Sequence, residues 1–224
     1  MTVTYPASAT NNLYITVSAG TSSLGGGIWS GRPDPKTPAP QLHLEYRSSN
    51  VDEVFFQLAS DSRPYNPDFT VVAVSNQGRI LRSGRHGNEP GTWTEAFVAS
   101  HGLTGAVYAN NVWVCVGREN LVVRTTDGAT WHESAGAIPG AMWQWLTFGG
   151  GRFVAVGYKT IDDPDNPGFT IDSGVIMYSD DDGVTWTKAN SGTSKRLTSI
   201  AYSPELNVFV AVGYDGTIIS VKGP

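Results

Sequence analysis

Short apolar runs alternate with polar, glycine-rich segments along this chain, and the runs resemble one another. The clearest, Phe153–Gly157 (Phe-Val-Ala-Val-Gly), returns at Phe209–Gly213 and, with Trp and Cys replacements, at Trp113–Gly117. Weaker copies lie at Val71–Ser75 and Tyr14–Ser18. Their β-branched and aromatic residues predict β-strands. No segment keeps a helical period, so we expect an all-β chain with very little helix.

The spacing of these runs matches a repeated small sheet. The central residues of the five runs are 57, 42, 40 and 56 residues apart. One small sheet cannot bury both of its faces alone, so a repeat of this length predicts a stacked or radial β-architecture.

One unit can be followed strand by strand. Its four expected strands are Trp143–Phe148, Phe153–Gly157, Val175–Ser179 and Thr185–Ala189, joined by Gly, Asn and Asp turns. Such an antiparallel meander, repeated along the chain, predicts a β-propeller of about five blades in one domain, 1–224. The approximate blades are 1–48, 49–98, 99–136, 137–190 and 191–224.

The sequences at the two ends of the chain allow more than one way of closing the ring. Thr2–Tyr5 resembles Ser199–Tyr202, so the first unit is expected to begin at the start of the chain, whereas the fifth stops after its third strand. Either the fifth blade lacks its outer strand or the N-terminal residues complete it. A four-bladed ring with 1–48 as a separate arm is the alternative.

Composition narrows the classes of function. Charged residues make up 16% of the chain, below the usual share of about a quarter, and the net charge is −5 with scattered basic residues. Nucleic acid is therefore not an expected partner. We expect no signal peptide, because the start lacks a basic and an apolar region, and no run spans a bilayer. The single cysteine, Cys115, replaces alanine in the repeat and is expected to be buried and inert.

Turns between third and fourth strands carry a motif. Ser179-Asp180-Asp181-Asp182-Gly183-Val184-Thr185-Trp186 resembles the Asp-box, Ser-x-Asp-x-Gly-x-Thr-Trp, of BNR-repeat, sialidase-like propellers. A copy one residue shorter ends at Trp131, and an enlarged one ends at Trp93. The resemblance implies structural roles for Ser179, Asp181, Gly183, Thr185, Trp186, Asp127, Gly128, Trp131 and Trp93. In such a turn the carboxylate accepts backbone N–H bonds, glycine supplies a positive φ and tryptophan packs between sheets.

The same resemblance bears on catalysis. Enzymes of the sialidase-like family have an early Arg-Ile-Pro motif and an arginine cluster, and they usually have six blades. Here the nearest string, Arg79-Ile80-Leu81, lacks the proline, and Arg82 and Arg124 hold equivalent strand positions instead of converging. We therefore expect no catalytic residues and no cofactor.

Three enlarged segments, 31–40, 61–68 and 159–173, are expected to be loops that carry specificity. The candidate ligand-binding residues are Trp145, Trp29, Tyr65 and Arg32. Trp145 stands where aligned first strands have Gly105 and Ser199, so it either reaches the channel mouth or fills the centre of a narrow ring. Asp163 and Asp165 could gather oxygen ligands for calcium, but they lack EF-hand spacing and solvated loop acids are commoner.

Strings of this type, an Asp-box followed by a Phe-Val-Ala-Val-Gly strand, resemble those of bacteriophage tail and virion proteins. That resemblance implies a non-enzymatic binding or structural module, such as a tail-tip, fibre or decoration protein. It would be made in the cytoplasm and act in the virion or outside the cell. Expected partners are other virion or tail proteins, or a host-surface glycan or protein, with an oligomer possible through the incomplete last blade. The alternatives are a soluble carbohydrate-binding lectin and a sialidase-like glycosidase.

Overall fold

The computed structural model describes residues 15–21, 25–31, 43–47, 53–61, 70–83 and 93–224, with side chains from Glu53 onward. Within these ranges the regular secondary structure is all β-strand apart from one short 3-10 turn, Tyr214–Gly216. No helix in the described part is long and apolar enough to cross a bilayer. The expectation of an all-β chain with very little helix is confirmed.

Five antiparallel sheets follow one another along the chain, each a simple meander. The first sheet contains β1 (Ile15–Thr21), β2 (Gly25–Gly31) and β3 (His43–Arg47). The second contains β4 (Phe55–Ser60), β5 (Val71–Ser75), β6 (Arg79–Ser83) and β7 (Trp93–Val98). The third contains β8 (Leu103–Ala109), β9 (Val112–Gly117), β10 (Leu121–Thr125) and β11 (His132–Ala135). The fourth contains β12 (Met142–Gly149), β13 (Arg152–Asp162), β14 (Thr170–Ser179) and β15 (Thr187–Ala189). The fifth contains β16 (Leu197–Ser203), β17 (Val208–Gly213) and β18 (Ile218–Lys222).

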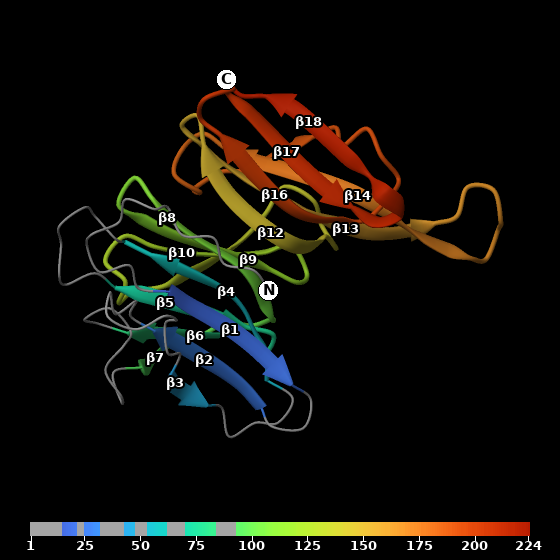
Figure 1. Cartoon of the computed structure of the whole chain (residues 1–224). Coiled ribbons are helices and arrows are strands. Elements are labelled where there is room, and N and C mark those ends of the chain that lie inside the picture. Colours follow the sequence, from blue (N-terminus) through green and yellow to red (C-terminus); the bar gives the residue numbers. More distant parts are fainter. Residues whose placement is uncertain (1–14, 22–24, 32–42, 48–52, 62–69, 84–92) are drawn as a thin grey trace, which may run out of the picture.

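The sheets pack face to face in series, and Figure 1 shows the first sheet (blue) and the last sheet (red) at opposite ends. The first strands β4, β8, β12 and β16 contact one another in turn. Each second strand also contacts the first strand of the next sheet, as β5 contacts β8 and β9 contacts β12. Because β1 contacts β4 in the same way, β1–β3 are the second to fourth strands of their unit and not a separate arm. The expected first strand, Thr2–Tyr5, lies outside the described residues.

Interior sheets are covered on both faces, which explains the apolar character of the repeated run. In β9, Trp113 and Cys115 pack toward the second sheet, while Val114 and Val116 pack toward the fourth. Each of these four side chains is buried. The thiol of Cys115 is free and buried, as expected, and burial raises its pKa far above the ordinary value for cysteine.

The glycine that ends the repeated run marks a close approach between strands. A Cβ on Gly117 would lie 2.1 Å from the carbonyl oxygen of Gly102, and one on Gly213 would lie 2.2 Å from that of Arg196. These carbonyls accept backbone hydrogen bonds from Arg118 and Tyr214 respectively, so they cannot move aside freely. A side chain larger than hydrogen is excluded at these positions.

The register confirms the alignment of first strands. Gly105, Trp145 and Ser199 each follow a β-bulge and pair with Val116, Val156 and Val212 of the neighbouring strand. They are equivalent positions of three sheets, as the sequence predicted.

The segment 159–173 is not a loop, contrary to our expectation. β13 and β14 continue through it with unbroken pairing, from Lys159 opposite Ser173 to Asp162 opposite Thr170. Only 163–169 form the connecting turn, and the hairpin projects beyond the rest of the fourth sheet (Figure 1). Pairing begun in the sheet propagates outward here, in spite of the Asp, Pro and Gly residues that suggested a loop.

Candidate functional site

The Asp-box turn of the fourth sheet is held by its own side chains. The Asp181 carboxylate accepts hydrogen bonds from the backbone N–H of Thr185 (2.8 Å) and from the Ser179 hydroxyl (2.8 Å). Gly183 has φ of +80° and donates its N–H to the Ser179 oxygen (2.9 Å). The Trp186 indole N–H donates to the Gly183 carbonyl (3.2 Å). The turn thus presents the tryptophan at a set position.

The shorter turn of the third sheet uses the same arrangement. The Asp127 carboxylate accepts the backbone N–H groups of Ala129 (2.8 Å) and Thr130 (2.7 Å) and the Thr125 hydroxyl (2.8 Å). Gly128 again has a positive φ, of +68°. The structural roles implied for these Asp-box residues therefore fit the observed geometry. Trp93 is buried, while the residues that precede it lie outside the described part.

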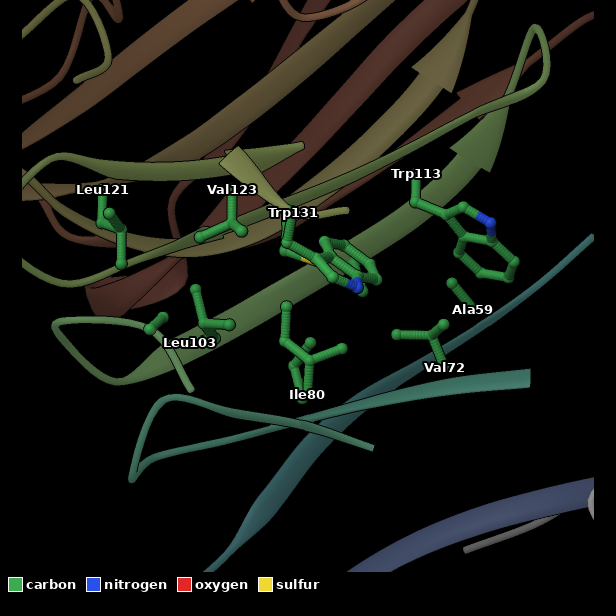
Figure 2. Packing of buried hydrophobic residues seen from close by; sticks show 12 residues of the cluster. Ala59, Val72, Ile80, Leu103, Trp113, Leu121, Val123 and Trp131 are labelled. Atoms are coloured by element: carbon green, nitrogen blue, oxygen red, sulfur yellow. The ribbon is translucent and has the colours of Figure 1, made fainter. Parts of the chain in front are cut away.

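Two of these tryptophans, Trp131 and Trp186, pack against the preceding sheet. Trp131 shares one apolar cluster with Val72 and Ile80 of the second sheet and with Trp113 and Val123 of its own. Figure 2 shows its indole between the strands of the two sheets. Trp186 packs in the corresponding place against the cluster between the third and fourth sheets, and Trp93 belongs to a cluster of the second sheet.

Arginines of one sheet lie beside the Asp-box turn of the next. Arg124 of β10 donates from Nε to the Asp182 carbonyl (2.8 Å) of the fourth sheet. Arg82 of β6 lies near Gly128, whose added Cβ would be 3.8 Å from its guanidinium carbon. These arginines therefore serve two different interfaces and do not converge on one site.

The fifth sheet ends at β18 and contributes no fourth strand, although all of 191–224 is described. A cleft of about 240 Å³ opens beside β18, between the fourth and fifth sheets. Its apolar lining comes from Val154, Ile176 and Tyr178 of the fourth sheet and from Phe209, Ile219 and Val221 of the fifth. Residues 191–224 form the three expected strands, and the N-terminal residues that could complete the sheet lie outside the described part.

Within the described part of the chain, no sheet covers the outer face of the fifth sheet. Val210, Val212 and Ile218 point away from the fourth sheet and are 38%, 40% and 71% exposed. Their counterparts in the third sheet, Val114, Val116 and Val122, are 0% exposed because the fourth sheet covers them. An apolar sheet face of this kind is unusual on a free surface and is typical of a contact site.

A polar cluster ties the β13–β14 hairpin to the fifth sheet. The Arg196 guanidinium forms an ion pair with Asp172 and lies over the Tyr158 ring, with 4.0 Å from its carbon to the ring centroid. Burial raises the pKa of Asp172, but hydrogen bonds from Thr160 and Arg196 outweigh it and lower the pKa from its ordinary value. Both charges are thus satisfied within the chain, which is typical of a structural contact.

The residues predicted to bind a ligand are not brought together within the described part. Trp145 is half-buried and packs against the cluster between the fourth and fifth sheets. At the equivalent position of the third sheet, a Cβ on Gly105 would lie 3.1 Å from the Leu146 backbone nitrogen in β12. The close approach of β12, and not a channel, therefore explains the glycine at this position. Trp29 lies in β2, opposite Val17, and its side chain is outside the described set. Arg32 and Tyr65 also lie outside the described residues.

The calcium candidates form a capped turn. The Asp163 carboxylate accepts the backbone N–H of Asp165 (2.9 Å) and the Asn166 side-chain amide (2.9 Å). These bonds hold the pKa of Asp163 below its ordinary value. In the part of the chain that the structure describes, no three His, Cys, Asp or Glu side chains gather as a metal site.

Sequence reasoning missed the cleft and the uncovered face. One signal in the sequence points to the cleft: Asp215-Gly216-Thr217-Ile218 begins a third strand, and no Thr-Trp pair occurs between it and Pro224. The uncovered face could not be read, because Val210 and Val212 match buried positions of the other units residue for residue.

Comparison with known proteins establishes the fold. No protein-family model and no curated protein matches this chain. Among solved structures it is similar to the computationally designed Ika4 protein, with a TM-score of 0.53 and 15% identity over 79% of this chain and 95% of that one. It is also similar to the WD40 β-propeller domain of Doa1 (TM-score 0.56, 11% identity, 92% of this chain, 61% of that one). A third is the β-propeller domain of Myceliophteria thermophila Cps50 (Swd1) (TM-score 0.58, 10% identity, 93% of this chain, 66% of that one).

These likenesses show the fold alone, and that fold is the β-propeller. This chain spans 61% of the Doa1 chain and 66% of the Cps50 (Swd1) chain. The expectation of propeller-like sheets in series is confirmed.

Proposed function

We propose that this chain is a non-enzymatic interaction module of a bacteriophage virion, in a tail tip, a fibre or a decoration. The observation that carries the proposal is the uncovered outer face of the fifth sheet, Val210, Val212 and Ile218. Phage origin is supported by the likeness of the Asp-box turns and repeated runs to those of virion proteins. The partner that fits is a β-sheet face of another particle protein.

A β-sheet face is the expected partner because each earlier sheet of this chain is covered by the next sheet. In the second to fourth sheets the equivalent residues, such as Val72, Val154 and Ile176, are each buried under the next sheet. The outer face of β17 repeats this pattern, so the same kind of partner is complementary to it. The first sheet of the same chain lies at the opposite end of the series (Figure 1).

Purified particles test this function. We expect the chain to sediment with virions, and Val212→Lys to abolish incorporation, because a buried charge in a sheet interface is strongly unfavourable. Leu206→Lys is the matched control, since Leu206 is a 73% exposed turn residue away from this face.

Four results would contradict the proposal. Absence of the chain from particles would contradict the assignment to the virion. Normal incorporation of Val212→Lys would show that the outer face of the fifth sheet is not the contact site. Binding of the isolated protein to a glycan array would favour a lectin, whereas turnover of a sialyl reporter would favour a glycosidase.

A further inference from the structure

The β13–β14 hairpin extends the fourth sheet beyond its neighbours. Its strands pair as far as Asp162 and Thr170, and 163–169 close it. The equivalent connections of the second, third and fifth sheets run only from 76 to 78, from 118 to 120 and from 214 to 217. The extension projects away from the other described sheets (Figure 1). No apolar cluster of the described chain includes a residue of 159–173, so the extension has no part in the core.

The two faces of the extension differ in character. Thr160 and Asp172 pair on one face, and Asp172 is ion-paired with Arg196, the residue before β16. Ile161 and Ile171 pair on the other face, because successive residues of a strand point to opposite sides. One face is thus fixed to the fifth sheet, while the other is apolar.

Phe169 continues the apolar face at the tip. The Asp163 N–H donates to the Phe169 carbonyl (2.8 Å), so the ladder gains one more pair and Phe169 shares the face of Ile171. The Phe169 N–H donates to the Asn166 carbonyl (3.1 Å), so its backbone is held while its side chain is 70% exposed. Ile161 is 39% exposed. A preorganised aromatic of this kind loses little conformational entropy when it binds.

Charge indicates the kind of partner. Asp162, Asp163 and Asp165 lie at the tip, and no basic residue occurs between Lys159 and Lys188. None of these three carboxylates forms an ion pair with the described residues. The tip is therefore unfavourable for nucleic acid and for an anionic membrane, and a second copy, with a net charge of −5, is not the favoured partner. A cationic surface is complementary to it.

The undescribed segments of this chain do not supply that cationic surface. They are 1–14, 22–24, 32–42, 48–52, 62–69 and 84–92, and their Asp, Glu, Lys and Arg side chains give net charges of 0, 0, +1, −1, 0 and 0. The complementary charge is therefore expected on another protein.

We infer that the apolar face of the hairpin, Ile161, Phe169 and Ile171, docks on another protein, in an apolar pocket with a rim of lysine or arginine. The Phe169 ring enters the pocket, and the carboxylates of the tip contact the basic rim. This inference goes beyond the proposed function and does not rest on it, because the hairpin and the outer face of the fifth sheet are different surfaces.

Three short synthetic peptides test the chemistry of this partner. They alternate Lys with Leu, Lys with Ser, or Glu with Leu, and each is labelled and titrated against the full chain by fluorescence anisotropy. We expect saturable binding of the Lys/Leu peptide alone, because only this peptide presents an apolar side together with a basic one. Its binding should weaken as salt is added, since the carboxylates are exposed, and it should slow hydrogen exchange at the amides of 161–171.

Variants locate the contact. Phe169→Ser should weaken binding of the Lys/Leu peptide about ten-fold or more, as for an aromatic anchor, and should not disturb the fold because the side chain is exposed. Asp162→Asn/Asp165→Asn should lower both the affinity and its salt dependence. Val184→Ser is the matched control and should leave binding intact, since Val184 is 58% exposed in another acidic turn of the same sheet, beside Asp182.

A photoreactive residue shows what covers the face. Phe169→benzoylphenylalanine should crosslink to the Lys/Leu peptide. A crosslink to another segment of the same molecule would show that the chain covers this face itself and would overturn the inference. So would no binding of the Lys/Leu peptide, equal binding of either other peptide, or unchanged binding by Phe169→Ser. None of these results affects incorporation into particles, so the inference and the proposed function fail separately.

Discussion

Asp181 shows how one carboxylate positions a tryptophan for an interface several residues away. Its oxygens accept hydrogen bonds from Ser179 and Thr185, and the turn they close ends in Trp186. All the groups involved lie within eight residues. The Asp-box could therefore be predicted from the sequence, since neither its bonds nor its glycine depends on the rest of the fold.

We expect Asp181→Ala to lower the free energy of unfolding by about 1 kcal/mol, as does loss of a side-chain cap from a backbone turn. Asp181→Asn keeps one acceptor oxygen and should have a smaller effect. Urea denaturation followed by tryptophan fluorescence measures both changes. An unchanged midpoint for Asp181→Ala would show that the carboxylate does not hold the turn.

The same carboxylates make the fold sensitive to acid. Backbone hydrogen bonds from Thr130 and Ala129 lower the pKa of Asp127, and hydrogen bonds from Thr185 and Ser179 lower that of Asp181 against the opposing effect of burial. A carboxyl group whose pKa is lower in the folded than in the unfolded chain stabilises the folded state at pH values above its unfolded-state pKa, about 3.9. This stabilisation is lost as pH falls from that value through the folded-state pKa.

We therefore expect stability to decrease below about pH 4. Asp127→Asn/Asp181→Asn should be less stable at pH 7 and should lose less between pH 7 and pH 3. Urea midpoints over this range are the measurement. Parallel pH profiles for the variant and the parent would contradict this.

At the scale of elements, the β13–β14 hairpin illustrates where reading the sequence was wrong. Its Asp, Pro and Gly residues predict a loop, yet the pairing of Thr160 with Asp172 and of Ile161 with Ile171 extends the sheet outward. The local composition favours a turn. However, β13 and β14 are already paired within the sheet, and the same register continues outward and keeps 159–162 opposite 170–173. Arg196, distant in sequence, then fixes the hairpin through Asp172 and Tyr158.

We expect Arg196→Ala to release this hairpin without unfolding the protein. Amides of 159–162 and 170–173 should exchange about ten-fold faster or more, because they lose the ion pair and the stacked ring, and local opening needs less free energy. Arg196→Lys should give an intermediate rate, since it keeps the charge but not the planar contact.

Hydrogen exchange with mass spectrometry gives these rates. Arg118→Ala, a change at an exposed arginine elsewhere, is the control and should leave the hairpin unaffected. Exchange in the hairpin that does not differ between the parent and Arg196→Ala would show that the ion pair does not restrain it.

At the scale of the whole molecule, stability depends on how many neighbours a sheet has. The third and fourth sheets lie between two others, while among the described residues the fifth sheet packs against the fourth sheet alone. In serial architectures stability is close to the sum of each unit and its interfaces, so the end unit is the weakest.

We expect amides of β16–β18 to exchange through openings of lower free energy than those of β8–β10. Native-state hydrogen exchange at increasing urea separates such partial openings from global unfolding. Equal opening free energies in the third and fifth sheets would instead indicate one cooperative unit.

Sequence alone determined the strands, the repeat and the Asp-box turns, because period-two patterning and turn hydrogen bonds act over a few residues. It also indicated three strands between residues 191 and 224. Only the tertiary structure decided which faces remain uncovered, what fills each interface and where Trp145 packs. Val116 and Val212 illustrate the reason: they hold the same position in the repeat, yet one is 0% and the other 40% exposed. The difference depends on whether another sheet follows, and no local pattern records that.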